Sequence, residues 1–359
     1  MNDKVINTKE NKILYLELLR VVSAFLVIAN HIIDKVVLAR HPSPTWTVSL
    51  IYLCISKVAV PLFVMIAGVT LLSKQESFKK SFSRFFKTFI VLIAASLFYI
   101  FYYYQYSLSF ALVWSKFSML LNKLATGPFW YLYMYLGLLL IMPFIRAMIT
   151  GFTEQHYLVL FSMYIVVYGV FHVGGSFFPQ LKLSSYFLDI FFNPYLIYVI
   201  AGYYIHFKLQ VNKSHAKVVS FIFLMSIGAQ TLLTYLYHKF INAESYLFLD
   251  YPKSAFVGIA AACLFYLSKC LLFDRDRPNK LITNQTVCGK IILQIGSCTF
   301  GIYIFSNYVI HRFNKDLFPL LVDNFHILIA AFIFNIFVFA FAFFITYVLK
   351  RVPIINKYL

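Results

Sequence analysis

The stretch ILYLELLRVVSAFLVIANHII, from Ile13 to Ile33, decides the class of fold. As a helix it is long enough to cross a hydrocarbon layer of about 30 Å. Similar apolar stretches follow along the chain, in which 61% of the 359 residues are hydrophobic and only 12% are charged. This composition excludes an ordinary soluble domain. The stretches are continuous rather than alternating, so the sequence predicts an all-α, polytopic membrane protein instead of a β-barrel.

Apolar windows separated by charged breaks predict about ten membrane spans in a single membrane domain, residues 1–359. No separate soluble domain or low-complexity linker interrupts them. The predicted spans are residues 13–33, 49–72, 88–108, 127–146, 157–172, 187–206, 218–238, 253–272, 291–311 and 326–349.

The loops between these spans differ in positive charge. Loops on the side of the two termini carry 19 Lys and Arg residues, and loops on the other side carry eight. Positive residues collect in cytoplasmic loops, so we expect both termini in the cytoplasm. The same bias accounts for the net charge of +18, because a protein embedded in the lipid bilayer collects Lys and Arg in its cytoplasmic loops. We therefore expect no nucleic-acid partner.

The first span carries a polar stripe. Glu17, Arg20, Ala24, Val27 and His31 recur at spacings of three and four, which places them on one helical face. Charged groups inside a bilayer are costly and indicate function by default, and histidine is suited to moving protons near neutral pH. The alternative interpretation is that Arg20 snorkels or pairs with Glu17, while His31 bonds a neighbouring helix at the interface.

Arg20, ten residues and then His31, at the start of a ten-span chain, resembles membrane acyltransferase family 3. Further segments resemble the motifs of that family in the same order along nearly the whole chain. These segments are VPLFVMIAGVTLL (60–72), SRFFKTFI (83–90), PFWYLYMYLGLLLIMPFIR (128–146), YVIAGYYI (198–205) and SCTFGIYIF (297–305).

The resemblance implies a function. Bacterial members of the family O-acylate surface polysaccharides and related glycans with acyl-CoA, so we expect a multi-pass protein of a bacterial cell membrane. It would transfer an acyl group, with acetyl as first choice, from cytoplasmic acyl-CoA to a hydroxyl of a surface glycan or its lipid-linked precursor. Acyl-CoA would be a donor substrate, with no permanently bound cofactor and no metal.

The resemblance also implies roles for individual residues. His31 would be catalytic, as general base or transient acyl carrier, with Glu17 balancing the charge of the stripe and Arg20 holding the donor. Arg84 and Lys87, in the basic segment 73–87, would hold the nucleotide end of the donor. The alternative for that segment is a positive anchor on anionic lipid.

Four more residues are candidate substrate contacts: Lys57, Trp130, Tyr133 and Tyr303. Lys57 lies inside the second span, four residues before Pro61, and its alternative role is snorkelling to the outer interface. Trp130 and Tyr133 open the fourth span, where an aromatic cluster could stack on a sugar or form an interfacial belt. Gly68, Gly202 and Gly301 are expected to permit close helix packing.

The chain departs from the family pattern at several positions. Lys87 stands where the pattern has a second arginine, so it offers a point charge and no bidentate geometry. Ala67 replaces a serine, Ser306 replaces a histidine, and Pro128 with Phe129 replaces a His-Leu pair. A second functional class stays open, a translocase for a glycan or lipid-linked sugar, in which the stripe lines a pathway and no acyl chemistry occurs.

Overall fold

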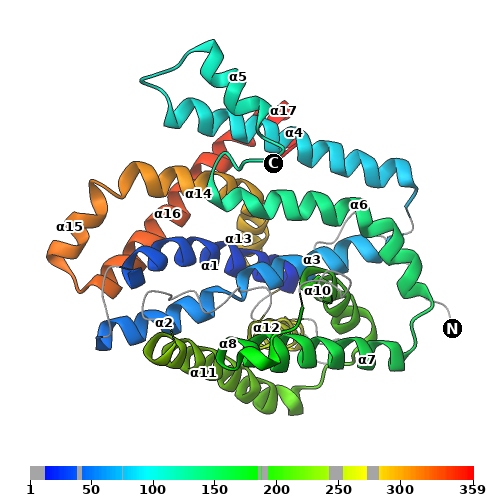
Figure 1. Ribbon diagram of the computed structural model, residues 1–359. Coiled ribbons are helices and arrows are strands. Elements are labelled where there is room, and N and C mark those ends of the chain that lie inside the picture. Colours follow the sequence, from blue (N-terminus) through cyan, green and yellow to red (C-terminus); the bar gives the residue numbers. More distant parts are fainter. Residues whose placement is uncertain are drawn as a thin grey trace.

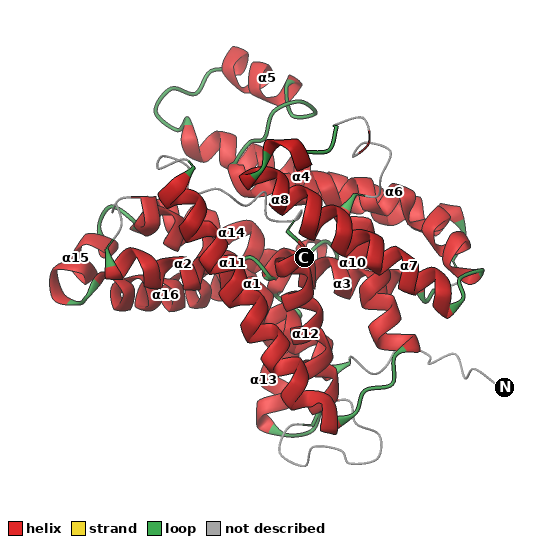
Figure 2. Ribbon diagram, turned by 60° about the horizontal axis from the view of Figure 1, so that its bottom comes forward, coloured by secondary structure: helices red, strands yellow, loops and turns green. Residues whose placement is uncertain are grey.

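The structure is a computed structural model of the chain, and it describes residues 13–38, 43–74, 76–184, 187, 193–241, 254–272 and 283–359. Over these ranges it consists of helices and loops without a strand, which confirms the all-α prediction (Figure 2). The α-helices are α1 (Leu14–Leu38), α2 (Pro44–Ser56), α3 (Ala59–Leu72), α4 (Phe78–Tyr103), α5 (Phe110–Ser118), α6 (Trp130–Thr150), α7 (Glu154–Ile165), α8 (His172–Phe177), α10 (Pro194–Tyr203), α11 (Ala216–Phe240), α12 (Ala255–Leu272), α13 (Val287–Gly296), α14 (Thr299–Phe313), α15 (Leu317–Asn324), α16 (Ile327–Leu349) and α17 (Pro353–Asn356). Two π-helical segments, η2 (Val166–Phe171) and η4 (Tyr204–Lys208), extend α7 and α10.

Among the residues that the structure describes, eight helical segments are long and apolar enough to cross a membrane, and the bent pair of α13 and α14 is a ninth if it forms one span. Each matches one predicted span, so the chain is a multi-pass membrane protein. The remaining predicted span, 187–206, lies partly outside the described residues. Within them it contains the short helix α10 and the start of η4.

Helix α1 runs through the middle of the bundle (Figure 1). It packs against α2, α3, α12, α13, α14 and α16, while α4 and α6 pack against each other. Because α1 carries the polar stripe, this central position turns the stripe toward other helices instead of lipid.

The third predicted span begins earlier than expected. The sequence predicts a basic loop at residues 73–87 and a span that starts at residue 88, whereas α4 begins at Phe78. The cations of this segment therefore lie on the first turns of a long helix. Lys and Arg stems can lie along an apolar helix while their charged ends reach water, so charge alone does not mark a helix end.

Two spans are broken in their interior. Lys57 and Val58 separate α2 from α3, and Pro61, which has no N–H, cannot bond the Lys57 carbonyl. Ser297 and Cys298 separate α13 from α14, whose axes differ by 66°. Non-helical backbone at membrane depth is tolerated where protein or a cavity surrounds it.

Glycine allows α3 and α10 to cross with their backbones in contact. A Cβ on Gly68 would lie 2.0 Å from the Val199 carbonyl oxygen, and one on Gly202 would lie 2.1 Å from the Met65 carbonyl oxygen. At Gly301, a Cβ would lie 2.3 Å from a side-chain atom of α16. The expectation that these three glycines permit close packing is confirmed.

A buried lysine closes the end of η4. The Lys269 ammonium donates to the carbonyl oxygens of Ile205 (2.8 Å), His206 (3.0 Å) and Leu209 (2.8 Å). A cation at the C-terminus of a helix satisfies carbonyls that have no intrahelical partner. Next to it, Tyr15 of α1 hydrogen-bonds the His206 ring, which attaches η4 to the central helix.

Candidate functional site

A cavity of about 630 Å³ lies beside α1. Its walls come from α1, the break between α2 and α3, α3 itself, α4, α6, α14 and Tyr195 of α10. The N-terminal ends of α3 and α14 both contribute, through Ala59 and Val60 in one case and Thr299 and Phe300 in the other. The two helix breaks therefore open onto the same space, where polar groups can meet a ligand.

The cavity extends along the stripe from Arg20 to His31. Arg20, Val27 and His31 all line it. Since α1 is one unbroken helix, the eleven residues from Arg20 to His31 correspond to about 16 Å of height. The prediction that these side chains face something other than lipid is confirmed.

Glu17 lies behind the cavity wall. Its carboxylate accepts a hydrogen bond from the Arg20 guanidinium, and its side chain is only 5% exposed while that of Arg20 is 30% exposed. A Cβ on Gly296 would lie 2.4 Å from Glu17 Oε2, so the glycine at the end of α13 makes room for this carboxylate. Glu17 thus holds Arg20 from behind and leaves the cavity to the guanidinium.

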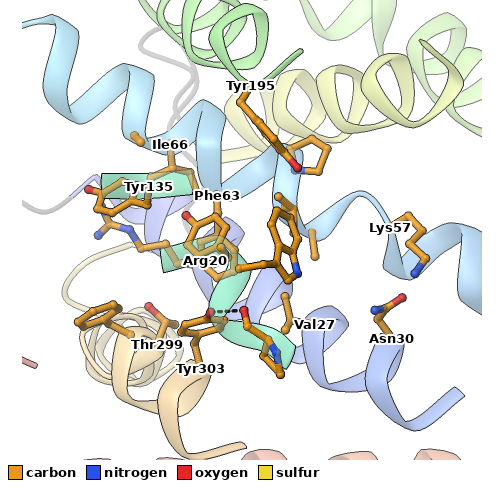
Figure 3. A pocket seen from close by; sticks show the side chains of 18 of the residues that line it. Arg20, Val27, Asn30, Lys57, Phe63, Ile66, Tyr135, Tyr195, Thr299 and Tyr303 are labelled. Carbon is orange, nitrogen blue, oxygen red and sulfur yellow. Dashed lines mark hydrogen bonds between the residues drawn. The ribbon is translucent and has the colours of Figure 1, made fainter. Parts of the chain in front are cut away.

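Lys57 lies at the same end of the cavity as His31. Figure 3 shows its ammonium group pointing toward the Asn30 side chain, and both residues line the cavity. Next to them, Ser56 and Asn30 are joined by a hydrogen bond of 3.3 Å between Ser56 Oγ and Asn30 Oδ1. This end therefore offers a cation, an amide and an imidazole to a polar ligand.

Aromatic rings form one wall. Trp130 and Tyr303, both predicted substrate contacts, line the cavity together with Tyr131 and Tyr135. Figure 3 shows Tyr135 and Tyr303. The Tyr131 ring lies 5.6 Å from that of Tyr303, whose hydroxyl donates to the Pro128 carbonyl at 2.5 Å.

Tyr133 is the exception among the predicted aromatic contacts. It does not line the cavity, and its hydroxyl donates to the Leu120 carbonyl instead. At about 100° per residue, position 133 lies on the face of α6 opposite Tyr131 and Tyr135.

Arg84 and Lys87 lie near the other end. Neither lines the cavity, but Thr88 does, four residues after Arg84. Arg84 forms a bidentate ion pair with Glu76, with Nη2 at 2.5 Å from Oε1, and Lys80 Nζ lies 3.7 Å from the same oxygen. Lys87 is exposed.

The charge of Glu76 is set by its neighbours. Burial by itself would raise its pKa, but hydrogen bonds from Arg84 and the positive charges of Arg84, Lys74 and Lys80 outweigh burial and lower the pKa below its usual value. The carboxylate is therefore ionised at neutral pH.

Sequence reasoning missed Glu76 and Arg146. Arg146 donates to the carbonyl oxygens of Leu71 at 2.8 Å and Glu76 at 3.4 Å, which ties α6 to the loop between α3 and α4. The available signal was that Glu76 is the sole acidic residue in segment 73–87, which also contains five cations.

Among the described residues, no group of three His, Cys, Asp or Glu side chains could hold a metal ion.

Comparison with known proteins gives one finding. The family model described as an acyltransferase domain, that of acyltransferase family 3, matches residues 13–351. The searches of curated proteins and of solved structures returned no match. The matched range contains all of the cavity, including Arg20, His31 and the two helix breaks.

Proposed function

The chain belongs to membrane acyltransferase family 3, and from this premise we propose that it moves an acyl group, acetyl as first choice, from cytoplasmic acyl-CoA to a glycan hydroxyl. The acceptor is a cell-surface glycan or its lipid-linked precursor, and the membrane is a bacterial cell membrane. The observation that carries the proposal is that one cavity contains both Arg20 and His31 over about 16 Å of height.

The reaction needs a base at the acceptor. A sugar hydroxyl is a poor nucleophile at neutral pH, and among the described residues that line the cavity His31 is the one histidine. His31 removes the hydroxyl proton as the oxygen attacks the thioester carbonyl carbon. The carbon–sulfur bond then breaks, CoA leaves as the thiol after taking up a proton, and the acyl group remains on the sugar oxygen.

Arg20 and His31 serve different ends of this complex. They are too far apart to act on the same carbonyl group. We assign Arg20, held by Glu17, to the donor arm, and Arg84 and Lys87 to the nucleotide end. The Lys57 side chain, at the His31 end, and the Trp130 side chain, in the aromatic wall, would contact the acceptor.

Transfer of label from acetyl-CoA to membrane glycan, in inverted vesicles, tests the proposal. We expect His31→Ala to lower transfer by about 10²- to 10⁴-fold, the contribution typical of general acid–base catalysis. His215→Ala, at an exposed histidine of the short segment Lys213–His215, is the matched control and should transfer label like wild type. If His31→Ala transferred label as fast as wild type, His31 would not be the base.

The translocase is the second candidate, and the continuous cavity along α1 is the observation that favours it. It predicts that wild type transfers no label from any acyl-CoA, while loss of the protein still changes glycan export. It further predicts that His31→Asn alters affinity without abolishing movement of the glycan.

A further inference from the structure

A cation cluster surrounds one buried carboxylate at the loop between α3 and α4. Glu76, whose side chain is 3% exposed, pairs with both terminal nitrogens of Arg84 and lies within 3.7 Å of Lys80. Lys74 also acts on Glu76 through its charge. The Arg84 side chain is 27% exposed, so it remains within reach of a solute.

The backbone that carries this carboxylate is held by a third helix. Arg146 of α6 holds the backbone of this loop through the Leu71 and Glu76 carbonyls. The cluster therefore contains Lys74, Lys80, Arg84 and Arg146 against a single anion, and it keeps excess positive charge even while Glu76 is ionised.

The cluster lies close to the end of the cavity opposite His31. Thr70, four residues before Lys74, and Thr88, four residues after Arg84, both line the cavity. Tyr135, another lining residue, lies within electrostatic range of both Arg20 and Arg84. A donor that enters the cavity from this end therefore passes the Arg84–Glu76 pair.

Carboxylate and phosphate oxygens bind the guanidinium fork in the same bidentate manner. From these observations we infer that Glu76 is an internal competitor for the donor phosphate: it occupies Arg84 in the empty protein and must release it when acyl-CoA binds. This inference rests on the proposed function, which assigns Arg84 to the nucleotide end. Under this inference, the affinity for the donor depends on Glu76 as well as on the cations of the cluster.

Glu76→Gln tests the inference, because it removes the charge and preserves the size of the side chain. We expect the KM for acetyl-CoA to fall roughly 3- to 10-fold, the range of a partly exposed ion pair, with kcat nearly unchanged. A merely structural ion pair predicts the opposite, an unchanged or higher KM. Glu154→Gln is the matched control, since Glu154 accepts a hydrogen bond from the Tyr204 hydroxyl and should leave KM unaltered.

Two further variants separate the inference from the proposed function. Arg84→Ala should raise KM and abolish the gain from Glu76→Gln in the double variant. If Arg84→Ala leaves KM unchanged, the donor site itself is wrong. If Arg84→Ala raises KM and Glu76→Gln does not lower it, only the competition is wrong.

Glu76→Asp serves as a second test if Glu76→Gln fails to fold. This substitution shortens the side chain that carries the carboxylate, so we expect a smaller fall in KM. An unchanged KM would overturn the inference.

Discussion

Gly296 and Glu17 offer the sharpest test of how Arg20 is held. A methyl group at Gly296 would collide with Glu17 Oε2 at 2.4 Å and Glu17 Cβ at 3.0 Å. We therefore expect Gly296→Ala to displace the carboxylate, loosen Arg20 and lower acyl transfer about tenfold or more, as small misplacements at a reaction site do. Gly137→Ala on α6, where a Cβ meets nothing within 4 Å, is the control. The test is to measure label transfer by both variants in inverted vesicles. If Gly296→Ala transfers label as fast as wild type, Glu17 does not hold Arg20 in this way.

Glu76 also gives a prediction for stability against pH. Its pKa in the folded protein is lowered from 4.5, so the ion pair contributes its full stabilisation above pH 4.5 and loses it as the pH falls toward the lowered value. We expect the difference in Tm between wild type and Glu76→Gln in detergent to be constant from pH 7 to about pH 5 and to shrink below about pH 4.5. A difference that stayed constant down to pH 3 would mean that the folded protein does not lower the pKa of Glu76.

The polar stripe shows how far single residues can be predicted from spacing. At about 100° per residue, Arg20, Val27 and His31 fall within about 40° of one another, and all three line the cavity. Glu17 and Ala24 lie at the edge of the stripe, and the structure places both behind the cavity wall, with Ala24 in an apolar cluster that includes residues of α14 and α16. Helical periodicity thus predicts a shared face. The periodicity of α1 contains no information on Tyr131 or Tyr195, because packing between residues distant in sequence places them opposite this face of α1.

The crossing of α3 and α10 positions one wall of the cavity, since Ile66, Ala67 and Thr70 of α3 line it. We expect Gly68→Ala or Gly202→Ala to force the two backbones apart and to cost about 1–3 kcal/mol or more, as over-packing does. Thermal unfolding in detergent should show a Tm several degrees lower for each. Gly228→Ala on α11, where a Cβ meets nothing within 4 Å, should not lower Tm. Equal Tm values for all three would mean that the crossing is looser than the structure shows.

The helix breaks show why some elements could not be predicted. Pro61 offers a signal for the break at Lys57, because the residue four positions earlier loses a helical hydrogen bond. The break between α13 and α14 contains no proline. It is stabilised from another helix, where the Lys350 ammonium donates to the Ser297 carbonyl at 2.8 Å. A contact between residues so distant in sequence leaves no local pattern, although apolar length alone was enough to predict the span as a whole.

The sidedness of the whole chain in the membrane is predicted from charge counts, and Cys288 makes this prediction testable. Cys288 is exposed at the start of α13, whereas the other four cysteines are buried. It belongs to the segment 273–290, which the sequence predicts as a loop and which the charge bias assigns to the cytoplasm together with the segment 73–87 that carries Arg84. We therefore expect a membrane-impermeant maleimide to label wild type in inverted vesicles and not in intact cells, and Cys288→Ser to remain unlabelled.

A cysteine on the opposite side completes this test. Lys123 is exposed in the loop between α5 and α6, which carries less positive charge and is expected outside. In the Cys288→Ser background, Lys123→Cys should be labelled in intact cells and Lys79→Cys, at the exposed start of α4, should be labelled only in inverted vesicles. The reverse pattern would place the Arg84–Glu76 pair outside the cell, where cytoplasmic acyl-CoA cannot reach it. Transfer from cytoplasmic acyl-CoA through this cavity therefore requires the sidedness that the charge bias predicts.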